Sequence, residues 1–161
     1  MKKLLTGVFA IVVLLLAAGK LSAQTVTTKE AAVTPSQVLE YAKAGKALLG
    51  GRTYVPITIQ KKVDKSSPIF KTLPLFEKGN ALINKVIKEG TAITPANALK
   101  YEQEMKEIND GISRLIAVTP MGHPIPECFK GCDDNYPGIG GGSGWKRFCC
   151  KMSCLIVETA D

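Results

Sequence analysis

The sequence holds a single histidine, His123, so histidine-based catalysis would rest on that one residue. It lies between Gly122 and Pro124, a loop context in which histidine is usually exposed. The chain has no C-x-x-C pair, which removes the familiar zinc knuckle and the thioredoxin-like redox motif. The P-loop and G-x-G-x-x-G patterns are also missing. With no complete catalytic set, we expect no catalytic residue, no cofactor and no resident metal.

The first 23 residues have the three parts of a secretory signal peptide. Lys2 and Lys3 precede an apolar run over 4–18, and small residues lead to Ala23. We expect cleavage after Ala23 and a secreted or periplasmic protein; an uncleaved anchor is the alternative. Removing residues 1–23 leaves 161 − 23 = 138 residues, with 21 − 3 = 18 basic against 14 acidic side chains, a net charge of +4. This mild charge does not favour nucleic acid as a partner.

The cysteines all lie near the end of the chain, and in an oxidising compartment such a cluster indicates a disulfide framework. Five cysteines form at most two bridges, in 5 × 3 = 15 arrangements that spacing does not distinguish. We expect Cys128 or Cys132 to bond a member of the later group, Cys149, Cys150 or Cys154. We expect no bond between the adjacent Cys149 and Cys150, and one spare thiol. The structural disulfide candidates are Cys128, Cys132, Cys149, Cys150 and Cys154.

Other chemistry for this region stays open as rival hypotheses. His123 with the cysteines could hold zinc, and Lys146, Arg147 and Lys151 could lower the pKa of a neighbouring thiol for redox work. The glycine-rich stretch 138–144 could form an anion-binding nest, and residues 133–135 begin like a calcium loop without its later acid.

A short stretch resembles the calcium loop and paired cysteines of secreted phospholipases A2. It comprises Tyr136, the glycines through Gly144, Arg147 and the Cys149-Cys150 pair. The resemblance implies a catalytic His-Asp pair soon after these cysteines, but residues 151–154 read Lys-Met-Ser-Cys. No catalytic role is therefore carried over.

Periodicity predicts a mainly helical domain over residues 24–119, with about three helices and a minor β element. One helix begins at Thr34 with a capping box and ends at Gly50-Gly51, and another covers 75–88. The longest covers 94–118 and has an apolar seam. The seam residues are Ala98, Tyr101, Met105, Ile108, Ile112 and Leu115.

Three further segments are expected to be non-helical. The β-branched run 54–59 predicts an edge strand, and Pro68 and Pro74 predict a loop over 66–75. Residues 120–154 contain seven glycines and four prolines, which argues against long helices in the segment 120–161. Residues 155–157 are expected to form a short strand or a packed tail.

Two patterns bear on assembly and partners. The starts Thr34-Pro35 and Thr94-Pro95 share Thr, Pro, Leu and Tyr at an offset of 60 residues, as a duplicated helix or a common helix opening would. Residues 52–88 carry eight basic and two acidic side chains, a local charge of +6 that favours an anionic partner if it is not simply a solvated face.

The leading functional hypothesis is an exported, non-enzymatic binding protein that presents a disulfide-constrained, glycine-rich aromatic loop. Its partner would be a protein or an anionic envelope component, and a disulfide-linked or helix-mediated dimer is a further possibility. The alternatives are a hydrolase or thiol-redox enzyme using His123 or a free cysteine, and a toxin or defence peptide precursor. The expected binding surface comprises Tyr136, Trp145, Lys146, Arg147 and Phe148.

Overall fold

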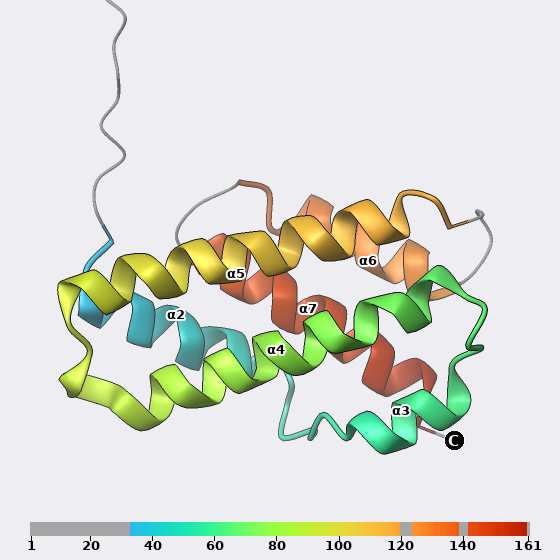
Figure 1. Cartoon of the computed structure of the whole chain (residues 1–161), viewed down its shortest axis with the longest axis horizontal. Helices are drawn as coiled ribbons and strands as arrows, with labels where there is room; N and C mark the ends of the chain where they lie inside the picture. Colours follow the sequence, from blue (N-terminus) through green and yellow to red (C-terminus); the bar gives the residue numbers. More distant parts are fainter. Residues whose placement is uncertain (1–32, 120–123, 139–141, 161) are drawn as a thin grey trace, which may run out of the picture. The chain divides into compact units, whose positions relative to one another are not determined.

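The computed structural model describes residues 33–119, 124–138 and 142–160, so the predicted signal peptide and His123 lie outside the described residues. The described part is mainly helical and contains no strand. Its elements are α2 (Pro35–Ala47), α3 (Pro56–Lys62), α4 (Pro68–Glu89), the 3-10 turn η1 (Gly90–Ala92), α5 (Pro95–Ile116), α6 (Pro124–Asn135) and α7 (Gly142–Glu158) (Figure 1).

Capping chemistry sets the starts of α2 and α5 as the sequence predicts. The Thr34 hydroxyl accepts a hydrogen bond from the Gln37 amide, and the Thr34 amide donates to the Gln37 side chain at 2.8 Å. Thr94 accepts from the Asn97 amide in the same way. At the far end of α2, Gly50 and Gly51 have φ of 56° and 81°, the left-handed conformation that glycine adopts most readily.

The predicted edge strand over 54–59 is wrong, because α3 begins inside it. Pro56 occupies the first turn of α3, where its missing amide hydrogen costs nothing. The predicted loop over 66–75 is also wrong, because α4 begins at Pro68. Ser67 caps α4 and Pro68 follows it, while Pro74 lies on the exposed side of the helix, where water can replace the lost backbone bond.

The expectation that the glycine-rich C-terminal segment lacks long helices is also wrong. Most of its glycines and prolines lie before α6, between α6 and α7, or in the first turn of either helix, and only Gly131 stands in a helix interior, so both helices run without a break. Residues 155–157 belong to α7 and form neither a strand nor a separate tail.

The core is built around α7, which packs against α2, α5 and α6, while α4 and α5 form a long helical pair joined by η1 (Figure 1). The rings of Phe76, Phe129 and Phe148 join α4, α6 and α7, with centroids 5.7 and 5.5 Å from that of Phe76. The α5 seam is buried as predicted, except that Leu115 is half-buried. The seam therefore packs in the chain's own core.

Candidate functional site

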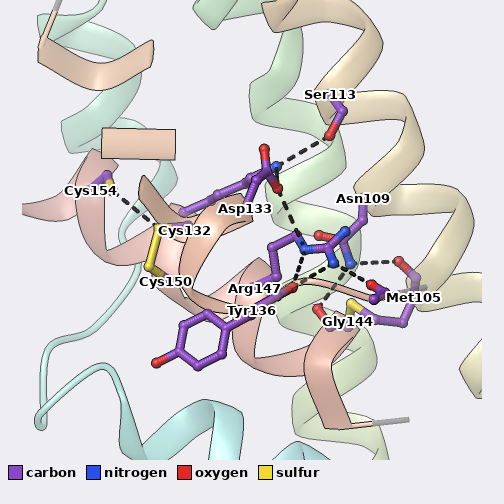
Figure 2. A network of polar contacts seen from close by, with 12 residues as sticks. Met105, Asn109, Ser113, Cys132, Asp133, Tyr136, Gly144, Arg147, Cys150 and Cys154 are labelled. Carbon is purple, nitrogen blue, oxygen red and sulfur yellow. Dashed lines mark hydrogen bonds and ion pairs between the residues drawn. A yellow bond between two sulfur atoms is a disulfide. The ribbon is translucent and has the colours of Figure 1, made fainter. Parts of the chain in front are cut away.

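Two disulfides join α6 to α7. Cys128 bonds Cys154 and Cys132 bonds Cys150, which confirms the predicted linkage between the first pair and the later group. Cysteines four residues apart share one face of a helix, so each helix presents two sulfurs to its neighbour. Cys132 Sγ also lies 3.7 Å from Cys154 Sγ, which places the two bridges side by side (Figure 2).

The fifth cysteine, Cys149, is free and fully buried on the side of α7 that faces α2. A Cβ atom added at Gly45 of α2 would lie 3.0 Å from Cys149 Sγ, so the two helices are in close contact there. Burial raises the pKa of the thiol to about 12, against a weaker lowering by the charge of Lys46. A protonated, enclosed thiol is a poor nucleophile, so Cys149 does not support a redox role.

We expect Cys149 to resist alkylation in the folded, oxidised chain and to react with one equivalent per chain after unfolding in urea without reductant. The folded pKa lies above the unfolded value of 9.0, so the stability that Cys149 contributes is present below about pH 9 and lost as the pH rises toward 12. Mass spectrometry after alkylation measures the first effect, and urea titrations of the wild type and Cys149→Ala measure the second. Rapid labelling of the folded chain would contradict the buried assignment.

A polar cluster connects α5, α6 and α7 beside the disulfides. The Lys151 ammonium is 1 % exposed and lies 2.7 Å from Asp133 Oδ1 and 3.2 Å from the Ser113 hydroxyl. Burial lowers the pKa of Lys151, and the hydrogen bond and charge of Asp133 oppose that shift. The ion pair links α6 to α7, and the hydrogen bond to Ser113 links α5 to α7.

Arg147 fixes the chain where it leaves α6. Its guanidinium donates to the carbonyls of Tyr136 and Gly138 and lies 3.5 Å from the Asp133 carboxylate (Figure 2). Asn109 makes a similar link, donating from its side chain to the carbonyls of Met105 and Gly144 at 3.0 Å. Gly138, the described start of the proposed anion nest, therefore offers its carbonyl oxygen to the Arg147 cation; residues 139–141 lie outside the described residues.

The expected aromatic binding surface does not form as a unit. Trp145 and Phe148 are fully buried, and the Trp145 indole nitrogen donates to Glu102 of α5 at 2.7 Å. Tyr136, Lys146 and Arg147 are half-buried. The two aromatic residues were expected in a loop, but α7 turns them inward, and this removes the core of the predicted surface.

Metal chemistry finds little support in this oxidised form. The Sγ atoms of Cys128, Cys132 and Cys154 lie within 4.8 Å of one another, but all three are bridged, and the thiolate is the metal ligand. Asp133, the first residue of the calcium-like stretch, lies in α6 and is engaged by Lys151 and Arg147. Its carboxylate pairs with these two cations of α7 and so links α6 to α7.

A different surface is hollowed, and it surrounds the C-terminal end of α7. Three adjoining hollows of about 240, 330 and 310 Å³ lie there, bordered by α3 and α6. Neighbouring hollows share lining residues, namely Lys62, Glu158 and Thr159. We call the three hollows and their lining side chains the α7-end face. Sequence reasoning missed it because it placed a strand where α3 lies and a tail where α7 ends.

Comparison with protein-family models, curated proteins and solved structures finds no match to this chain. The functional argument therefore rests on the chemistry of its own residues. Within the described ranges, none of the helices combines the length and apolar character needed to cross a membrane.

Proposed function

We propose that this chain is an exported, non-enzymatic binding protein and that the α7-end face is its binding surface. One observation carries the proposal. Six large apolar side chains of the described residues are exposed, and four of them lie in or beside this face. Apolar exposure concentrated beside hollows is typical of interaction surfaces. The four are Leu48, Val55, Ile57 and Val157; the other two are Leu99 and Val118.

Export is supported by two independent features. Residues 1–23 have the basic, apolar and small-residue parts of a signal peptide. The two disulfides between α6 and α7 fit an oxidising compartment, because thiols in the cytosol are kept reduced.

The packing of the side chains supports the alternative functions less well. A thiol enzyme would need an accessible thiolate, whereas Cys149 is buried with a raised pKa. A toxin released as a C-terminal fragment would have to separate α6 and α7 from the core. That separation would expose Phe129, Trp145 and Phe148, all buried in the intact chain.

Site-specific photo-crosslinking tests the proposal. A photoreactive phenylalanine analogue replaces Val157 of the α7-end face or Ile57 beside it on α3, and Leu99 serves as the control because it is exposed on α5. We expect a defined adduct from Ile57 and Val157 in the secreted or envelope fraction of the producing cell, and none from Leu99. Equal labelling from all three positions, or none from the two face positions, would overturn the proposal.

A further inference from the structure

We propose that the hollow between α3 and the end of α7 binds a small amphipathic carboxylate, an aliphatic chain ending in one carboxyl group. This inference rests on the proposed binding function and names a ligand class for one part of the α7-end face. The walls of the hollow are largely apolar, with Val55 and Ile59 on one side and Ile156 and Ala160 on the other. Such walls favour a hydrocarbon chain.

The polar groups of this hollow are few and match one anionic head group. Lys62 is the only charged residue in its lining, and no ion pair joins it to a carboxylate within the described residues. Thr53 and Thr58 also line the hollow, and their hydroxyls have no hydrogen-bond partner in the described part of the chain. A carboxylate can accept from the ammonium and from these hydroxyls.

The surrounding charge directs an anion to this end of the molecule. Two of the four lysines of α4 are paired with acids, Lys78 with Glu104 at 3.3 Å and Lys85 with Glu89 at 4.0 Å. The exposed lysines in and just after α3, which are Lys61, Lys62 and Lys65, make no ion pair in the described residues. These three are half of the six basic residues of 52–88 that make no ion pair in the described residues, and they lie in or just after the helix that borders the hollow.

The size of the hollow and its comparison with the two neighbouring hollows restrict the class of ligand. A volume of about 240 Å³ is below the ~300–1,000 Å³ of sites for drug-sized ligands, which favours a short chain over a nucleotide or a large cofactor. The next hollow also contains Lys62 but adds Asp64 and Glu158, and the third has Glu158 and no basic residue. Among the three hollows, as the described residues line them, the α3–α7 hollow alone combines apolar walls with a cation and no acid.

The test uses the intact oxidised chain and octanoate as the probe, followed by amide chemical shifts. We expect saturable shifts around Thr58 and Ile156, little response to acetate, and little response to octylammonium. Lys62→Gln should weaken octanoate binding about 3- to 10-fold, because it removes the charged partner of the carboxylate. Lys61→Gln is the matched control, since Lys61 is exposed on the same helix but does not line the hollow.

A second variant tests whether the hydrocarbon chain of octanoate lies in the hollow. Ala160→Phe should fill the hollow and abolish octanoate binding without lowering the thermal midpoint, because Ala160 is exposed at the end of the structure. Equal affinity for octanoate and octylammonium, or equal effects of Lys62→Gln and Lys61→Gln, would overturn the carboxylate assignment. Failure to bind octanoate while Ile57 and Val157 still crosslink would reject this inference alone. Binding of octanoate without any crosslink would reject the proposed macromolecular partner alone.

Discussion

Replacing all four bridged cysteines with serine is expected to lower the free energy of unfolding by about 5 kcal/mol. The bridges span 26 and 18 residues, and chain entropy assigns about 3 kcal/mol to a loop of that length. Because the Cys132–Cys150 loop lies inside the Cys128–Cys154 loop, the second bridge closes a shorter path and the two effects are less than additive. A domain typically has only about 5–15 kcal/mol in total, so the variant should be near its limit of stability.

Equilibrium urea unfolding followed by helical circular dichroism measures this loss. Each pair is also replaced alone, and each paired variant is expected to lose about 2 kcal/mol relative to the oxidised wild type, because the remaining bridge still contributes about 3 of the 5 kcal/mol. Cys149 stays in all variants, so changes in its buried environment do not enter the comparison. A fourfold variant within about 1 kcal/mol of the wild type would show that the α6–α7 bridges do not stabilise the fold.

Asp133→Asn is expected to cost about 3 kcal/mol, whereas Lys151→Met should be close to neutral. The asparagine removes the negative charge beside the buried ammonium and leaves it with neutral hydrogen-bond partners such as the Ser113 hydroxyl. This cost is at the lower end of the range for broken buried ion pairs. The Asp133 side chain is 41 % exposed, so water can replace part of the lost interaction with Lys151. Methionine removes the buried charge instead, and Asp133 keeps Arg147 at 3.5 Å.

The same pair carries a pH signature. Burial lowers the folded pKa of Lys151 below its ordinary value of 10.5. Between the two pKa values the unfolded chain binds more protons, so the contribution of Lys151 to stability rises with pH. Removing Asp133 lowers the folded pKa further and widens this window towards neutral pH. Urea titrations at about pH 7 and about pH 10 should therefore show a larger rise for Asp133→Asn than for the wild type, relative to Lys151→Met. A greater loss from Lys151→Met than from Asp133→Asn would contradict this account.

The local signals in the sequence predicted the helices that have caps and a regular apolar seam. Thr34 and Thr94 hydrogen-bond the first turns of α2 and α5, and the seam of α5 is buried. These features depend on residues close together in the chain. Pro56 was interpreted as part of an edge strand and Pro68 as a breaker, although each stands in the first turn of a helix, where proline is well tolerated.

Long-range contacts explain the other failures. Gly79 reads as a weak point of a helix, yet a Cβ there would lie 2.3 Å from the Phe148 ring, so the glycine makes room for α7. The burial of Trp145 and Phe148 follows from α7 being a central helix, which the density of nearby glycines concealed. The disulfide pairing did have a signal. Two C-x3-C spacings, at Cys128/Cys132 and Cys150/Cys154, match one face of each of two antiparallel helices.

The position of Cys149 next to Cys150 has a consequence for the order of events during folding. In an extended chain the two neighbours are almost equivalent targets for an oxidant. Once α7 has wound, consecutive residues are about 100° apart around the axis, and only Cys150 faces α6. Helix formation before oxidation therefore favours the bond from Cys132 to Cys150 over a bond to Cys149, and an oxidant that acts earlier would trap mispaired chains.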